Sequence, residues 1–492
     1  MKKLLSFLSM SAIMAFAISC GEDEDPTPSS EFDAPTASAG AVADLIEGES
    51  GTATFTVSID SDLTGTWAAT SSGGITLTAT SGDISGGSVE VGFDAITAGA
   101  ASVTLTVTDS ESQSASATTT AFNVVGEAAP EVVVVSGIFT EDVTWTADKI
   151  YELAGRVVVD SAATLTIEPG TIIKGREGEG AAASALLIAR YGKIEANGTG
   201  DAPIIFTSVI DNIMPGQTVG TNLSENENGL WGGLLILGNA PISADASSEQ
   251  IEGIPADFSF GLYGGENPAD NSGSLNYVSV RHGGSLIGEG NEINGITLGG
   301  VGSGTSITNI EVVGNKDDGV EWFGGNVNVT NLLIWAADDD GIDIDQAYSG
   351  TIDNAVVIAF DGTDHGLEID GPEGALAGSF TIQNLTVKGF NDELGQYRDG
   401  ATGTTSNAYF FGFQTIAEGE GDLSLDDATT LDGLTFSGLQ VTLPADASAI
   451  TDVLADGIDA FGSTVDQGAN TVGADTSVFG WTMASEKGAL DF

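Results

Sequence analysis

A motif that recurs every 22 to 30 residues in the second half of the chain constrains the fold more than any other feature. Each copy is a short aliphatic and β-branched run interrupted by one asparagine: Asn309, Asn331, Asn354 and Asn384. Successive asparagines are 22, 23 and 30 residues apart. A period of this length without a helical pattern predicts coils of two or three short strands that stack into a parallel β-helix.

An acidic motif follows the asparagine motif in the first three copies. It reads Asp-Asp-Gly-Val-Glu at 317–321, Asp-Asp-Gly-Ile-Asp at 339–343 and Asp-His-Gly-Leu-Glu at 364–368. Strand alternation turns the aliphatic residues into the coil and the acidic residues out of it. Because neighbouring coils lie about 4.8 Å apart, equivalent positions should form three columns: Glu321, Asp343 and Glu368; Phe323, Asp345 and Asp370; and Asp318, Asp340 and His365.

These stacked acids leave three interpretations open, because like charges at this spacing repel by about 1 kcal/mol in water and by more where water is excluded. The face is solvated, or it binds a cation, or it carries out acid–base catalysis. Calcium prefers carboxylate oxygens, and its predicted ligands are Glu321, Asp343, Asp345, Glu368 and Asp370. Paired carboxylates can also hydrolyse glycosidic bonds, and the candidates for that role are Asp318, Glu321, Asp340, Asp343, His365 and Glu368.

The charge balance limits the partners of the chain. Its 492 residues include 71 acidic and 13 basic residues, for a formal net charge of −58. So few bases exclude nucleic acid as a partner. The 41% hydrophobic content is too high for a disordered acidic chain. The single cysteine excludes a disulfide framework, and Ca²⁺ is the only cofactor that the residues suggest.

The first residues have the pattern of a lipoprotein signal. Lys2 and Lys3 precede an apolar run, Leu4–Ile18, which is too short to be assigned as a membrane span. The following Ala17-Ile18-Ser19-Cys20 resembles a bacterial lipobox, which implies lipidation of Cys20 after removal of residues 1–19. Residues 20–32 form an acidic tether that resembles the surface-export signal of Bacteroidota lipoproteins. The expected location is therefore the outer membrane, at the cell surface.

Residues 33–126 are predicted to form a β-sandwich. Apolar residues occupy alternate positions in runs such as 53–59 and 102–107, and Gly, Ser and Asp turns separate the runs. The stretch 103–125 resembles the closing strands of PKD-like or Ig-like modules, which implies a spacer.

Residues 130–492 complete the predicted all-β fold with the β-helix. The segments 165–175, 193–199 and 231–242 resemble Bacteroidota surface lipoproteins with a right-handed, pectate-lyase-like β-helix, and the resemblance extends over about 145–492. It implies the fold and no particular reaction. The runs Asp338-Asp339-Asp340 and Asp364-His365-Gly366 also resemble the acids and histidine of polygalacturonases. That family has Gly-His-Gly where this chain has Asp-His-Gly, and its Arg-Ile-Lys motif is not found here.

Three segments, 209–230, 241–274 and 391–432, interrupt the repeat and are predicted to be insertions. If exposed, their aromatic residues suit a glycan or protein ligand; if buried, they cap the fold. They are Phe258, Phe260, Tyr263, Tyr397, Tyr409, Phe410 and Phe411. Trp231, Trp322 and Trp335 are expected in the core, and the asparagines are expected to form a ladder between coils.

The leading functional hypothesis is a membrane-anchored, non-enzymatic module. It would capture a glycan or an outer-membrane protein, with calcium stabilising the acidic face. The alternative is a polysaccharide-degrading enzyme, either a glycoside hydrolase or a lyase, that uses acids on the β-helix face.

Overall fold

The computed structural model describes residues 32–126, 129–255, 258–286, 292–390, 394–414, 423–426 and 429–492. The chain divides into two compact units with the boundary between Ala129 and Pro130. The predicted signal segment, Cys20 and the tether up to residue 31 lie outside the described residues. Within the described ranges, no helix is long and apolar enough to cross a membrane.

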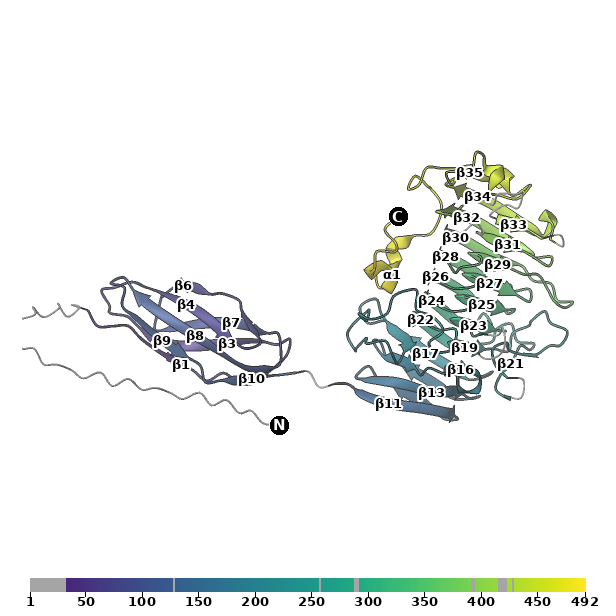
Figure 1. The fold of residues 1–492 in the computed structure, drawn as a ribbon. Coiled ribbons are helices and arrows are strands. Elements are labelled where there is room, and N and C mark those ends of the chain that lie inside the picture. Colours follow the sequence, from purple (N-terminus) through teal and green to yellow (C-terminus); the bar gives the residue numbers. More distant parts are fainter. Residues whose placement is uncertain are drawn as a thin grey trace, which may run out of the picture. The chain divides into compact units, whose positions relative to one another are not determined.

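The first unit is a sandwich of two sheets around one apolar core (Figure 1). The first sheet has the order β1 (Thr36–Ala39), β3 (Ser50–Ser58), β7 (Ser88–Ala95) and β5 (Ile75–Leu77). The second has the order β2 (Leu45–Ile46), β10 (Phe122–Val125), β8 (Gly99–Asp109), β4 (Gly65–Ser72) and β6 (Ser81–Asp83), and β9 (Ser114–Thr118) pairs with β8. Alternate residues of β3, such as Phe55 and Val57, are buried as predicted.

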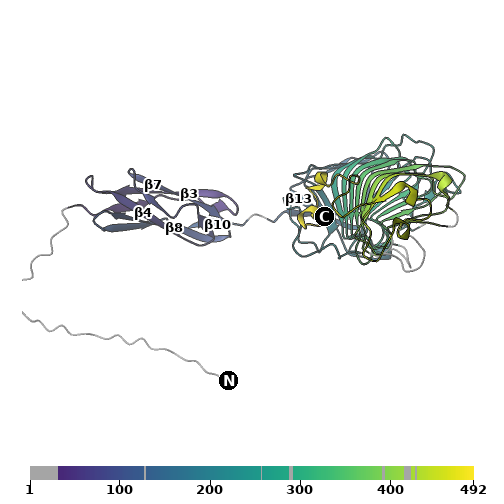
Figure 2. The ribbon, with the colours of Figure 1, turned by 90° about the horizontal axis from the view of Figure 1, so that it is seen from above.

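The second unit is a right-handed parallel β-helix, and its 23 paired strands confirm the predicted fold class. In Figure 1 its coils rise from blue β11 to yellow β35, and Figure 2 looks at the unit from above. The strands of the first coils are β11 (Glu131–Phe139), β12 (Val143–Trp145), β13 (Lys149–Val159), β14 (Thr164–Ile167), β15 (Ile172–Gly175), β16 (Ala185–Ile188), β17 (Lys193–Asn197), β18 (Ile204–Ser208) and β19 (Leu234–Leu237).

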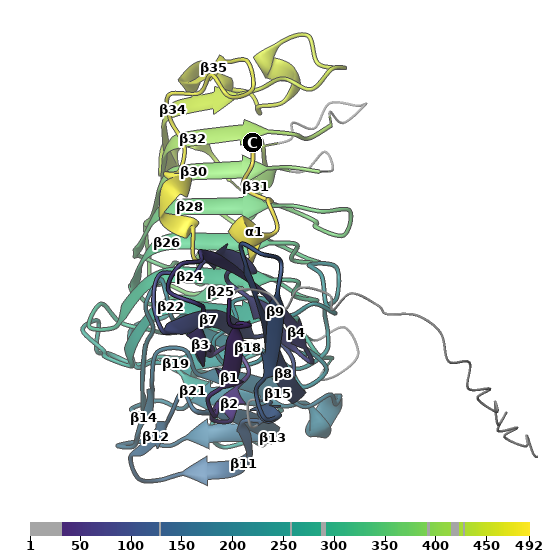
Figure 3. The same ribbon diagram turned by 90° about the vertical axis from the view of Figure 1, so that its left-hand side faces the viewer.

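The later coils alternate one long and one short strand. The long strands are β22 (Gly273–Arg281), β24 (Ser306–Val313), β26 (Asn328–Trp335), β28 (Thr351–Ile358), β30 (Phe380–Lys388), β32 (Gly403–Phe411) and β34 (Leu434–Val441). The short strands are β23 (Ile296–Gly299), β25 (Val320–Phe323), β27 (Ile342–Asp345), β29 (Leu367–Ile369), β31 (Gly395–Tyr397), β33 (Leu423–Leu425) and β35 (Gly462–Thr464). From β22 to β34, the long strands pair in parallel with long strands and the short strands with short ones, one coil further on, while the last strand, β35, pairs with the long strand β34. In Figure 3 the long strands are successive rungs.

The interior of the coils is a continuous apolar core. Val320 and Trp322, Ile342 and Ile344, and Leu367 and Ile369 all belong to it, which confirms the predicted inward face. Trp231 and Trp322 are fully buried there, whereas Trp335 packs outside the coil under the C-terminal segment.

The asparagines of β24, β26 and β28 form a ladder at the corner inside these long strands, whereas Asn384 of β30 donates to Asp353 Oδ1. The Asn331 amide donates to Asn309 Oδ1 at 2.8 Å, and the Asn354 amide donates to Asn331 Oδ1 at 2.8 Å. The partners are thus side-chain amides of neighbouring coils, where backbone groups were expected. All three residues have positive φ, between 54° and 61°. Asparagine tolerates this left-handed conformation better than most residues, so one residue both turns the chain and links the coils.

One predicted insertion is wrong. Much of 391–432 continues the coils as β31, β32 and β33, and Tyr397, Tyr409, Phe410 and Phe411 are buried coil residues. The segments 209–230 and 241–274 do interrupt the repeat. Part of the second, which includes the β20 (Glu249–Gln250) and β21 (Leu262–Tyr263) hairpin, packs apolar side chains on the outer face of β16 and β19. This insertion therefore shields the outer face of β16 and β19 from solvent.

The C-terminal segment descends across the outer face of the long strands (Figure 3). Ala474 N donates to Thr386 Oγ1, Asp475 N to Asn354 Oδ1, and Ala484 N to Glu311 Oε1. The segment contains η5 (Thr476–Phe479) and α1 (Met483–Glu486) and follows three short 3₁₀ turns, η2 (Leu431–Gly433), η3 (Ile450–Asp452) and η4 (Asp459–Phe461). A further such turn, η1 (Gly180–Ala182), lies in the early coils. The C-terminal segment bonds to residues of β24, β28 and β30 and therefore fastens several coils together.

Replacing Asn331 tests the ladder. Asn331→Ala should lower the free energy of unfolding by about 2–4 kcal/mol, because it removes two hydrogen bonds and puts alanine in the left-handed region. Asn331→Gly should cost less, since glycine accepts this conformation. Denaturant titration of both variants provides the measurement. Equal losses in the two variants would show that the backbone conformation contributes nothing.

Candidate functional site

The predicted acid columns lie on the outer face of the sheet formed by β25, β27 and β29. Glu321 pairs with Asp343, and Asp343 pairs with Glu368, in adjacent strands. In the column before the glycine corner, Asp340 N donates to Asp318 Oδ1 at 3.0 Å, and His365 N donates to Asp340 Oδ1 at 2.8 Å. The stacking inferred from the repeat is therefore present residue by residue.

Two groups of three side chains bring their ligand atoms within 4.8 Å of one another on this face. We call Asp318, Glu321 and Asp343 the carboxylate triad, and Asp340, His365 and Glu368 the histidine triad. Asp317 and Asp339 form a third such group with Asp318 at its edge. The shared Asp318 makes the carboxylate triad part of a larger acidic surface.

The interpretation of this face as simply solvated is wrong for its central acids. Asp318 and Glu321 are 6% exposed, and Asp340 is 3% exposed. A residue outside the acidic strands contacts one of them, since the Asn294 amide donates to Glu321 Oε2. Two residues further along β25, Tyr263 of the 241–274 insertion packs on Phe323 with ring centroids 5.8 Å apart. Side chains that point away from the coil interior on this face are therefore not all exposed to solvent.

Two buried oxygens beside the carboxylate triad lack a hydrogen-bond donor among the described residues. They are Asp343 Oδ1 and Asn294 Oδ1. Leaving a buried polar atom unpaired costs roughly 1–3 kcal/mol. An oxygen-lined position with unpaired lone pairs is the donor set that a hard cation requires.

Burial shifts the acid–base behaviour of these groups. It raises the pKa of Asp318, Glu321 and Asp343 well above the ordinary range, and the neighbouring carboxylates add to the effect. Burial and nearby acids also raise the pKa of Asp317 to about 7 and of Asp345 to about 8. Near neutral pH, this face therefore requires protons or a cation.

The histidine triad has an internal cation. His365 Nδ1 lies 2.9 Å from Asp340 Oδ1 and 3.5 Å from Glu368 Oε2. Burial alone would lower the pKa of His365, but contacts with Asp340 and Glu368 raise it to about 10. Burial raises the pKa of Asp340 to about 8. For Glu368, hydrogen bonds with His365 and Asp340 and the Arg398 charge outweigh burial and lower the pKa to about 2.

Arg398 divides the predicted calcium ligands into two sets. Its Nε and Nη2 donate to the two oxygens of Asp370 at 2.8 and 2.9 Å, and it forms an ion pair with Glu368. Glu368 and Asp370 are therefore neutralised by a side chain, whereas Glu321 and Asp343 lie with Asp318. Arg398 lies within 391–432, which the interrupted repeat predicted to be an insertion. Its register, two residues after Gln396, which pairs with Glu368, was the signal that could have located it.

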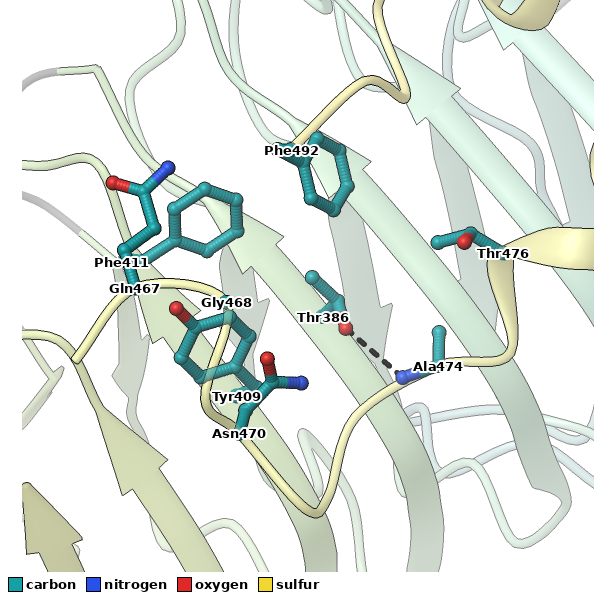
Figure 4. A pocket seen from close by; sticks show the side chains of 9 residues that line it. All are labelled: Thr386, Tyr409, Phe411, Gln467, Gly468, Asn470, Ala474, Thr476 and Phe492. Atoms are coloured by element: carbon teal, nitrogen blue, oxygen red, sulfur yellow. Dashed lines mark hydrogen bonds between the residues drawn. The ribbon is translucent and has the colours of Figure 1, made fainter. Parts of the chain in front are cut away.

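A small hollow lies on a different face, beneath the C-terminal segment (Figure 4). Its volume is about 100 Å³, and its floor includes the stacked rings of Tyr409 and Phe411, with centroids 4.9 Å apart. Both residues are at most 3% exposed. The rings mainly seal the C-terminal segment, with Phe492 5.0 Å from Phe411, and offer little surface to a ligand.

Comparison with known proteins gives one result for the fold and none for the chemistry. No curated protein and no solved structure matched the chain. The family model described as a pectate-lyase-like β-helix domain matches residues 137–484. This match spans most of the chain and coincides with the stacked coils that carry both triads. The chain thus belongs to the pectate-lyase-like β-helix family.

Proposed function

We propose that this protein is a surface-anchored lipoprotein module that binds Ca²⁺ at the carboxylate triad and captures a glycan without degrading it. The observation that carries the cation site is the burial of Asp318 and Glu321 beside the half-buried Asp343, whose Oδ1 is buried and unpaired. Three clustered carboxylates, two of them buried, with no ion pair to a base among the described residues are costly unless a proton or a cation joins them.

The charges around the triad favour this assignment. The groups that act most strongly on Glu321 are Asp318, Asp345, Glu252 and Asp317, and all of them are acids. Around the histidine triad, by contrast, Arg398 and His365 balance the acids. The donors of the carboxylate triad are all oxygens, which suits Ca²⁺ better than a metal that prefers nitrogen or sulfur.

The proposed glycan follows from the family, and the proposed location follows from the first residues of the chain. The family is named for a polysaccharide-cleaving fold, and fold alone does not assign a function. The lipobox-like Ala17-Ile18-Ser19-Cys20 and the acidic residues after it support an outer-membrane, cell-surface position. There the β-helix would bind its glycan beside an outer-membrane protein, with the sandwich as a spacer.

Hydrolysis of a glycan is the second candidate, and one observation favours it. Asp340 and Glu368 lie in one group, yet their pKa values are driven apart, to about 8 and about 2. Such a pair matches a general acid that stays protonated and a carboxylate that stays ionised. Asp340 would donate the proton to the leaving oxygen, and Glu368 would act as nucleophile or base.

Calcium should stabilise the protein. A ligand that binds only the folded state adds about 2.7 kcal/mol at a hundredfold excess over Kd, so millimolar Ca²⁺ should raise the Tm of the metal-stripped chain by a few degrees. Asp343→Asn should abolish most of the rise, whereas Glu141→Gln, an exposed acid in an early coil, should retain it. An equal rise in both variants would refute the assigned site.

The metal-free protein should lose stability as pH rises from about 5 to about 8. Acids whose pKa is raised on folding, such as Asp317 and Asp345, stabilise the fold while protonated. That contribution disappears as pH passes through their folded-state values of about 7 and 8. Thermal unfolding in a chelator from pH 5 to 8 measures it, and Ca²⁺ should flatten the profile. If the Tm of the metal-free protein increased toward pH 8, the carboxyl groups of this face would not have raised pKa values in the folded state.

The two candidate functions differ in turnover. The purified protein should release no reducing sugar from neutral or acidic polysaccharides. If it does, Asp340→Asn should reduce the rate by at least about a hundredfold, while Glu141→Gln should not change it. Such a result would replace capture by hydrolysis as the function.

A further inference from the structure

A second hollow opens at the edge of the early coils, and it shares no residue with either triad. Its volume is about 210 Å³. The turn between β16 and β17 forms one wall, the turn after β13 forms another, and the 241–274 insertion closes the third side. The lining residues are Asp160, Ser161, Ala189, Arg190, Tyr191, Ser259, Phe260 and Leu262.

Tyr191 is the unusual residue of this hollow. It is 56% exposed, and its φ is 75°. The equivalent corner one coil earlier is Ala162, with φ 68°, and Ala162 N donates to Tyr191 O at 3.1 Å. The residue at this corner therefore adopts the left-handed backbone conformation, which glycine or asparagine would adopt with less strain. Nothing in the turn requires a tyrosine, so the ring serves something outside the turn.

Among the described residues, one other tyrosine has a positive φ, and its ring has a partner inside the protein. Tyr277, with φ 50°, packs edge-on against Trp481 with ring centroids 5.4 Å apart. The ring of Tyr191 instead projects from the surface and is held there. The Arg190 guanidinium lies 5.5 Å from the ring centroid, and the Tyr191 hydroxyl donates to Asn239 Oδ1 at 3.2 Å. Arg190 is itself fixed, since its Nη1 donates to Gly264 O at 2.8 Å.

The hollow thus presents a flat, oriented aromatic ring between polar groups. Arg190 supplies N–H donors, Asp160 supplies carboxylate acceptors, and the Ser161 and Ser259 hydroxyls do both. Phe260 and the 40% exposed Leu262 add apolar surface on the opposite side. An apolar ring face surrounded by hydroxyls that both donate and accept is the ligand that fits, and a sugar ring has this chemistry.

Size and charge narrow the class further. Pockets that enclose a whole drug-sized ligand measure roughly 300–1,000 Å³, so a hollow of about 210 Å³ suits one ring of a chain that continues outside it. The net charge of −58 repels polyanions such as polyuronates. A neutral polysaccharide satisfies both conditions, because one of its sugar rings can enter the hollow while the rest stays outside, and it carries no negative charge.

We propose that Tyr191, Arg190 and Asp160 form a binding subsite for a neutral polysaccharide, with one sugar ring stacked on Tyr191. This inference rests on the proposed capture of a glycan and names where and what the protein binds. It does not depend on the cation site, because the two sites share no residue.

Isothermal calorimetry on the full purified chain, with neutral gluco-, manno- and xylo-hexasaccharides in millimolar Ca²⁺, tests the subsite. The wild-type chain should bind at least one of them. Tyr191→Gly should weaken that binding by at least about tenfold, and its Tm should not fall, because glycine relieves the left-handed corner. Tyr191→Phe keeps the ring and should bind within about threefold of the wild type. Phe461→Ala, which removes a 47% exposed ring from η4, is the matched control and should bind normally.

Each outcome is decisive for a different claim. Binding that Tyr191→Gly leaves unchanged refutes the subsite and keeps glycan capture. No binding of any hexasaccharide by the wild-type chain overturns the subsite and glycan capture together, while a surviving calcium shift would retain the cation site. Self-association that is lost in Tyr191→Gly, without sugar binding, would assign the ring to a protein contact and overturn the proposal.

Discussion

The structure depends on one geometric constraint: each coil repeats the register of the coil before it. Hydrogen bonds between parallel strands fix neighbouring coils about 4.8 Å apart, so a side chain at one position of the repeat contacts a side chain of similar type at the same position in the next coil. For Val320, Ile342 and Leu367 this produces a continuous apolar core. For Asn309 and Asn331 it produces a ladder of amides. For Glu321 and Asp343 it produces a contact between like charges. Stability and the candidate chemistry therefore have the same origin.

On the acidic face, the stacked carboxylates are neutralised in two different ways. Where a base is available in the next register, as Arg398 is for Glu368 and Asp370, the charges cancel. Where it is not, as at Asp318, Glu321 and Asp343, burial raises the pKa of each acid. Two adjacent groups built from the same repeat thus differ in kind. One is a balanced network with a histidine, and the other is a site that favours a cation or protons.

The repeat predicted the fold and the columns because both follow from spacing alone. It also identified every member of the two triads, since the acidic motif kept its register through three coils. It did not predict their burial, because Asn294, which contacts Glu321, lies outside the motif and reaches it only through tertiary folding. Arg398 was missed for a related reason: Glu368 pairs with Gln396, which is not acidic, so the acidic motif does not extend to the strand that Arg398 follows.

The early and late coils use their outer faces differently, and this difference separates the two proposed sites. On β16 and β19 the outward residues Leu187 and Leu235 are apolar, and the 241–274 insertion buries them. On β25 and β27 the outward residues are acids except Phe323, and Tyr263 of the insertion packs on Phe323. The insertion contributes Phe260 and Leu262 to the hollow at Tyr191, and its Glu252 is one of the charges that raise the pKa of Glu321. A single segment outside the repeat thus contributes to both sites, while the repeat supplies the residues for only one of them.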